Sequence, residues 1–114
     1  MLKTETAGVS VIRKDASLVC SILGDIDHHS ARAIRLKIDE EIALMRPDKL
    51  ILDVSNVTFM DSSGLGLILG RYNKAAEVGA MCILVNPNEN VTKILDIAGI
   101  GRLIRIERSS KHHE

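Results

Sequence analysis

Strand-like and helix-like segments alternate along almost the whole chain, and this alternation limits the possible folds more than any other feature of the sequence. Two short apolar runs rich in β-branched residues, 8–14 and 17–24, flank the turn-like stretch KDAS and predict a β-hairpin. Helical and strand patterns then follow one another to residue 107. The predicted order is β-β-α-β-α-β-α-β, which indicates an α/β fold in which helices pack on a mixed β-sheet.

Three segments have the periodicity of amphipathic helices. Asp27 or Ser30 is the candidate N-cap of the first helix, and Pro47 follows its end. The second helix ends before Gly79 and the third before Gly99, since glycine is a common C-terminal stop. The apolar face of the first helix comprises Ile34, Ile38, Ile42 and Met45. The first predicted helix lies within 25–46, the second covers 63–78 and the third 88–98, and the strands that alternate with them cover 49–57, 80–86 and 102–107.

The length of 114 residues fits one domain, which we expect to span 1–114 with its core over about 8–107 and a polar tail over 108–114. The core must consist of Ile, Leu, Val, Ala and Met, because the chain has one Phe, one Tyr and no Trp. Cys20 and Cys82 lie inside apolar runs, so we expect two buried thiols in a protein of a reducing compartment.

Charge and hydropathy argue against nucleic acid and membranes as partners. Lys and Arg total 15, as do Asp and Glu, and no long block of one sign occurs. The shortage of aromatic side chains also weakens any interpretation that requires base stacking. The N-terminus lacks the apolar segment of a signal peptide and no apolar run reaches membrane-spanning length, so we expect a cytoplasmic protein.

The stretch FMDSSGLGLILGRY, residues 59–72, puts Asp61, Ser62, Ser63 and Gly64 where a strand ends and a helix begins. Sites in such sheets lie past the carboxyl ends of strands. Two interpretations stay open: the Asp-Ser-Ser sequence is good helix-capping chemistry, and the free N–H groups of a helix start also favour a phosphate. A serine nucleophile is disfavoured, because the stretch is not GxSxG and no histidine is placed beside Ser62.

The glycines of GLGLILG are only weak evidence for a nucleotide-binding loop, because the spacing is not GxGxxG and no GK[ST] follows. We expect them to lie within the helix, where each glycine costs up to about 1 kcal/mol relative to alanine. Three glycines in one helix indicate that another surface approaches its backbone closely, either inside the domain or on a partner protein.

The stretch GDIDHHSA, residues 24–31, forms a second polar cluster. A turn and helix cap with solvated histidines is its simplest interpretation. A metal site built from Asp25, Asp27, His28 and His29 is disfavoured, because adjacent residues of one turn rarely point at one ion and no distant ligand motif occurs. We therefore expect no metal ion.

Taken together, GDIDHHSA, FMDSSGLGLILGRY and ILDIAGIGRLIRI resemble the STAS-domain anti-sigma factor antagonists, and most closely the sporulation type of endospore-forming bacteria. The resemblance covers about residues 8–107 and implies a single STAS domain. DSSGLG marks the wider family, whereas DHHSA and ILGRY point to the sporulation type.

The resemblance implies a molecular switch with no catalytic activity and no cofactor. Unphosphorylated antagonists of this family bind an anti-sigma factor that is also a serine kinase, and so release the sigma factor. The kinase then phosphorylates the antagonist and breaks the complex, and a PP2C-type phosphatase removes the phosphate. The phosphorylated residue corresponds to Ser62, and the partner-binding residues correspond to Asp27, Asp61, Ser62, Ser63 and Gly64.

Two alternatives and one departure accompany this resemblance. The chain is alternatively a STAS antagonist of a stress-response system, or a nucleotide-binding enzyme that uses the glycine-rich stretch and Ser62. The family usually ends with a further helix after the last strand, whereas RSSKHHE is short and polar. We expect that helix to be absent or frayed, at a cost to stability but not to kinase binding.

Overall fold

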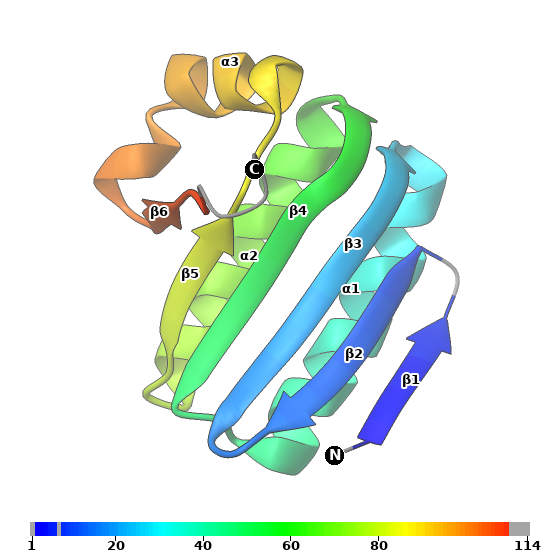
Figure 1. Ribbon diagram of the computed structural model, residues 1–114, viewed down its shortest axis with the longest axis vertical. Coiled ribbons are helices and arrows are strands. Elements are labelled where there is room, and N and C mark those ends of the chain that lie inside the picture. Colours follow the sequence, from blue (N-terminus) through cyan, green and yellow to red (C-terminus); the bar gives the residue numbers. More distant parts are fainter. Residues whose placement is uncertain (1, 7, 110–114) are drawn as a thin grey trace.

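The computed structural model describes residues 2–6 and 8–109 and contains a six-stranded sheet with the strand order β1-β2-β3-β4-β5-β6 (Figure 1). The β1–β2 and β2–β3 pairings are antiparallel, and the other three are parallel. The predicted α/β class with a mixed sheet is therefore confirmed. In chain order the elements are β1 (Leu2–Thr6), β2 (Val9–Lys14), β3 (Ser17–Ile26), α1 (His28–Met45), β4 (Lys49–Met60), α2 (Ser62–Glu77), β5 (Met81–Val85), α3 (Glu89–Ala98), the 3-10 helix η1 (Ile100–Arg102) and β6 (Arg105–Glu107).

Helices α1 and α2 lie side by side on one face of the sheet, behind it in the view of Figure 1. The predicted apolar face of α1 packs against the sheet: Ile34, Ile38 and Ile42 are buried, and Met45 is partly buried. The two thiols are buried as well, as predicted. The largest fully buried side chains are all aliphatic or methionine: Leu18, Ile22, Ile26, Ile34, Ile38, Leu50, Leu52, Met60, Ile68, Leu84, Leu95 and Ile100.

The two central strands β3 and β4 are much longer than their neighbour β5, with 10 and 12 residues against 5. β4 extends past the predicted end at residue 57, because its pairing with β3 continues to Met60. Two register shifts in this pairing change the spacing of buried β4 residues from two to three at Val54, Val57 and Met60. This break of the alternating pattern made the end of the strand unreadable from sequence.

The structure corrects the prediction at both ends of the sheet. β1 is an edge strand that the sequence did not predict, because LKTET is almost entirely polar. The predicted strand 102–107 is wrong in its first half, since residues 100–102 form η1 and β6 begins at Arg105. Gly99, with a φ of 71°, ends α3, and the Leu103 N–H then bonds back to the Ile100 carbonyl at 2.9 Å. These local bonds keep the segment out of the sheet until Arg105.

The predicted polar tail begins with two anchored residues. Arg108 Nη1 donates to the Pro87 carbonyl at 3.2 Å, and the Ser109 N–H donates to Asn86 Oδ1 at 2.7 Å. The rest of the tail, and with it the expectation of a missing C-terminal helix, lies outside the described residues. Within the described ranges, no helix combines the length and hydropathy needed to cross a membrane.

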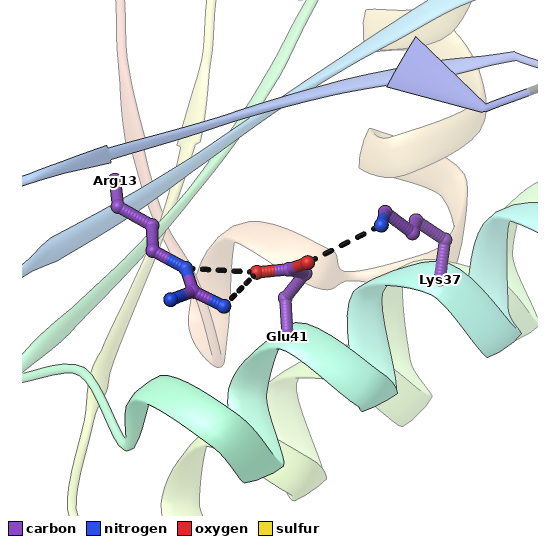
Figure 2. Close-up of polar contacts among 3 residues, drawn as sticks. All are labelled: Arg13, Lys37 and Glu41. Atoms are coloured by element: carbon purple, nitrogen blue, oxygen red, sulfur yellow. Dashed lines mark hydrogen bonds and ion pairs between the residues drawn. The ribbon is translucent and has the colours of Figure 1, made fainter. Parts of the chain in front are cut away.

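An ion-pair cluster joins α1 to β2 (Figure 2). Glu41 is only 6% exposed, and its Oε1 accepts bonds from Arg13 Nε at 3.0 Å and from Arg13 Nη2 at 2.7 Å. Lys37 Nζ lies 3.2 Å from Glu41 Oε2. Burial by itself raises the pKa of Glu41, but the bonds from Arg13 and Lys37 outweigh it and hold the pKa below its ordinary value. The cluster therefore fixes α1 against the antiparallel part of the sheet.

Candidate functional site

Asp61 connects β4 to α2 and is the N-cap of that helix. Its backbone is extended, and its Oδ1 accepts a 2.7 Å bond from the Ser63 N–H. The Gly64 N–H donates to the Asp61 carbonyl at 2.9 Å. These bonds start the helix at Ser62, one residue earlier than predicted, because an aspartate cap accepts from the second or third helical N–H.

Ser62 and Ser63 are adjacent but differ in access to solvent. Ser62 is the first helical residue and is exposed, whereas Ser63 is half-buried. Within the described part of the chain, neither hydroxyl makes a hydrogen bond to another residue. The first N–H groups of a helix have no intrahelical partner and carry partial positive charge. A phosphate on Ser62 would therefore lie at an end of α2 that favours negative charge.

Asp27 is the N-cap of α1, and Ser30 completes a capping box with it. Asp27 Oδ1 accepts from the His29 N–H at 3.0 Å and from the Ser30 N–H at 2.9 Å, while Ser30 Oγ accepts from the Asp27 N–H at 2.9 Å. The bond from the Ser30 N–H, with that from His29, lowers the pKa of Asp27. Asp27 and Ser30, the two N-cap candidates of the sequence, therefore cap α1 together. The carboxylate is exposed and ionised.

The two polar clusters meet at the edge of the sheet where β3 and β4 end. The neighbouring strands β3 and β4 run parallel and end in a paired Ile26 and Met60, so Asp27 and Asp61 follow side by side. The Asp61 N–H donates to the Ile26 carbonyl at 3.2 Å. One exposed edge therefore carries both helix starts, both capping carboxylates and Ser62.

The three glycines of α2 have different surroundings, which corrects the expectation of one close contact along all of them. A Cβ on Gly64 would lie 2.8 Å from the Met60 Cβ, so Gly64 is needed for packing inside the domain. A Cβ on Gly66 or on Gly70 would meet nothing within 4 Å. All three lie in a helix rather than in a phosphate-binding loop.

A groove of about 400 Å³ lies between α1 and α2, directly beside Ser63. Sequence reasoning missed it, because it forms only where the two helices meet. Its α1 side carries His28, Arg32 and Arg35, which follow one another at helical spacing. This spacing is the one sequence feature that could have indicated a basic face on α1. The remaining lining residues are Ala31, Ser63, Gly66 and Leu67.

The described residues contain no group of three His, Cys, Asp or Glu side chains that could hold a metal ion. The rings of His28 and His29 lie 6.0 Å apart, edge to face. Burial raises the pKa of both Cys20 and Cys82 to about 12, so both thiols are protonated at neutral pH.

The STAS domain family model matches residues 7–113 of the chain. The anti-sigma F factor antagonist of Paenibacillus polymyxa is 35% identical over 89 residues, which cover 78% of this chain and 76% of that protein. The anti-sigma-B factor antagonist of Bacillus subtilis (strain 168) is 30% identical over 103 residues, covering 90% of this chain and 93% of that protein.

Solved structures of the anti-sigma factor antagonist SpoIIAA agree with these matches. The unphosphorylated form superposes with a TM-score of 0.79 at 30% identity, over 90% of this chain and 89% of that one. The phosphorylated form of SpoIIAA, described as a Bacillus cell fate determinant, gives a TM-score of 0.72 at 29% identity, over 90% and 92% of the two chains. This chain therefore belongs to the STAS-domain family, and within it to the anti-sigma factor antagonists.

Proposed function

We propose that this chain binds an anti-sigma factor and thereby releases a sigma factor, and that phosphorylation of Ser62 turns this binding off. The observation that carries the proposal is the position of Ser62: it is exposed, its hydroxyl makes no hydrogen bond to the described residues, and it is the first residue of α2 after the cap Asp61. The existence of SpoIIAA structures in phosphorylated and unphosphorylated forms supports the same chemistry for this relative.

The switch needs an acceptor that a kinase reaches and that also touches the partner. An exposed serine at a helix start meets the first requirement. The second follows if the edge that carries Asp27, Asp61, Ser62, Ser63 and Gly64 is the docking surface. Phosphorylation adds about −1.5 to −2 charges at this edge. The start of α2 tolerates that charge inside the domain, so the phosphate acts on the complex rather than on the fold.

The proposal includes the partners implied by the family. The anti-sigma factor is also the serine kinase that modifies Ser62, and a PP2C-type phosphatase reverses the modification. This chain acts by binding and has no catalytic role of its own, and all three proteins meet in the cytoplasm. Of the two capping carboxylates, Asp27 belongs to an exposed residue and Asp61 to a half-buried one, and Asp27 contributes a direct contact to the kinase.

Phosphosite mapping tests the proposal. The chain is incubated with its cognate anti-sigma kinase and ATP, and the modified residue is identified by mass spectrometry. We expect one phosphate, on Ser62, with labelling lost in Ser62→Ala and kept in the matched variant Ser63→Ala. Full labelling of Ser62→Ala on Ser63 would overturn the assignment.

The identity of the sigma system has two candidates, because the relatives include both an anti-sigma F and an anti-sigma-B antagonist. The higher identity to the anti-sigma F relative favours the sporulation type, and the stress-response type remains the second candidate. Pull-down with the anti-sigma factors of both systems separates them. ATP binding by the isolated chain would instead support the nucleotide-binding alternative, for which the helical glycines of α2 provide no phosphate loop.

A further inference from the structure

The groove between α1 and α2 is lined by positive charge without a matching carboxylate. Arg32 and Arg35 project from successive turns of α1 and are exposed, and His28 lies one turn before them. Of the residues that the structure describes, no Asp or Glu lines the groove. This imbalance stands out in a chain whose formal net charge is zero.

Three other arginines of the described chain have carboxylate partners, which Arg32 and Arg35 lack. Arg13 pairs with Glu41, Arg71 with Asp39 and Arg105 with Glu107. Among the described residues, no carboxylate lies within 4 Å of the guanidinium of Arg32 or Arg35. Their charge is therefore available to a ligand.

A third arginine, Arg71 of α2, is paired with Asp39 but also lies within the electrostatic reach of Arg35. Arg71 of α2 is only 4% exposed, and its Nη1 has no hydrogen-bond partner among the described residues. Burial lowers the pKa of Arg71, and the charge of Arg35 lowers it further against the opposing effect of Asp39. A negative group bound at Arg35 would reduce this repulsion between the two guanidinium groups.

The size and lining of the groove suit a protein side chain better than a small free anion. Its volume is about 400 Å³, and the apolar residues Ala31 and Leu67 are part of its lining. Gly66 leaves open space above α2, because a Cβ there would meet nothing within 4 Å. Aspartate and glutamate side chains combine a carboxylate for Arg with methylene groups for such a lining.

We infer that this groove receives an acidic segment of the anti-sigma factor, whose Asp or Glu carboxylates pair with Arg32 and Arg35. The inference rests on the proposed function, and it names the chemistry of the partner. It also gives an electrostatic reason for the switch. Ser62 precedes the groove-lining Ser63, so its phosphate would add negative charge at the entrance of a site that binds negative charge.

The main test is a charge reversal with a matched control. Arg32→Glu/Arg35→Glu is titrated calorimetrically against the cognate anti-sigma factor at several ionic strengths, beside Arg102→Glu, which changes an exposed arginine of η1. We expect the double variant to bind at least about tenfold more weakly at low salt and to lose much of the salt dependence of Kd, with Arg102→Glu unchanged. Equal affinities for the double variant and wild type would overturn the inference.

Gly66→Leu tests the same groove without changing any charge. The new side chain fills open space next to the arginines, so the fold survives while the groove is blocked. We expect at least about fivefold weaker binding with an unchanged or higher melting temperature. Unchanged affinity with a folded variant would show that nothing enters the groove.

Binding and phosphorylation of the wild type distinguish a wrong inference about the groove from a wrong proposed function. If wild type binds the anti-sigma factor and is phosphorylated on Ser62, but the groove variants bind equally well, the groove alone is rejected. If wild type does not bind any anti-sigma factor, both the inference and the proposed function are rejected.

Carbodiimide cross-linking of Arg32→Lys/Arg35→Lys to the bound partner identifies the segment of the partner that enters the groove. Cross-links from the lysines introduced at positions 32 and 35 to Asp or Glu of the partner support the inference, and cross-links only from other lysines contradict it.

Discussion

Gly64 packs directly on Met60: a Cβ added to Gly64 would lie 2.8 Å from the Met60 Cβ and 2.7 Å from its sulfur. Met60 is the last residue of β4 and is fully buried, so it has little room to move away. This contact sets how closely the start of α2 approaches the end of β4. The glycine of the DSSG sequence therefore has a packing role that is separate from any contact with a partner.

We expect Gly64→Ala to destabilise the protein by roughly 1–3 kcal/mol, because the extra methyl group overpacks a closed contact. Gly66→Ala is the matched control, since it lies on the same helix with open space around its Cα. That change should stabilise the protein by up to about 1 kcal/mol through helix propensity. Urea denaturation of the two variants measures both effects, and shifts of the same sign would contradict the structural difference between these glycines.

We expect Ser62→Ala to keep its affinity for the anti-sigma factor and Ser62→Asp to lose it. Removal of one hydroxyl costs roughly 0.5–1.5 kcal/mol at most. A carboxylate introduced into a buried contact costs several kcal/mol when it finds no partner. Calorimetric titration compares the two variants. Ser17→Asp, at the opposite end of β3, serves as the charge control, and equal binding by Ser62→Asp and Ser17→Asp would remove Ser62 from the interface.

The alternation of periodicities was enough to predict most of the fold. The spacing of Ile34, Ile38 and Ile42 predicted which face of α1 is buried, because a helix repeats every 3.6 residues or so. β1 was missed for a physical reason: an edge strand is held by backbone bonds to its neighbour, and LKTET carries no apolar alternation to reveal it. The turn of η1 was missed because local carbonyl bonds after Gly99 outcompeted strand pairing.

The candidate site was predictable where capping chemistry is local and unpredictable where it depends on tertiary contacts. Asp27 and Asp61 were expected at helix starts because Asp is a good N-cap, and both cap there. The groove requires Arg32 of α1 and Ser63 of α2 to lie next to each other on one face of the sheet, which no local pattern encodes. Sequence reasoning likewise could not tell Gly64 from Gly66, because only Gly64 faces Met60.

We expect Glu41→Gln to lower the free energy of unfolding near neutral pH by about 1–3 kcal/mol. The buried amide would replace the negative charge that Arg13 and Lys37 surround (Figure 2). The folded-state pKa of Glu41 lies below its ordinary value of 4.5. Its stabilisation is therefore fully present above about pH 4.5 and is lost as pH falls through the folded-state pKa.

Melting temperatures of wild type and Glu41→Gln, measured from neutral pH down into the acid range, check this prediction. The two curves should converge as the pH falls. Glu77→Gln is the control, because the Glu77 side chain is 67% exposed and its contact with Lys74 is 4.0 Å long. If the two variants have the same pH dependence, the cluster on α1 does not contribute specifically.

Asp27 has two candidate roles, as the N-cap of α1 and as a contact to the kinase. As a cap, Asp27 accepts bonds from the His29 and Ser30 N–H groups, and asparagine makes the same bonds about as well. As a partner contact, the exposed Asp27 needs its negative charge to pair with a basic group of the kinase. We therefore expect Asp27→Asn to melt like wild type but to bind the kinase at least about tenfold more weakly.

Asp27→Ala completes this comparison, because it removes cap and charge together. It should bind as poorly as Asp27→Asn and also lose stability, since alanine cannot accept the bonds from the His29 and Ser30 N–H groups. Circular dichroism melts and calorimetric titration with the kinase give the two readouts for each variant. A normal affinity and normal phosphorylation of Asp27→Asn would show that Asp27 acts only as a helix cap. The docking surface would then lie nearer α2, where Ser62 begins the helix.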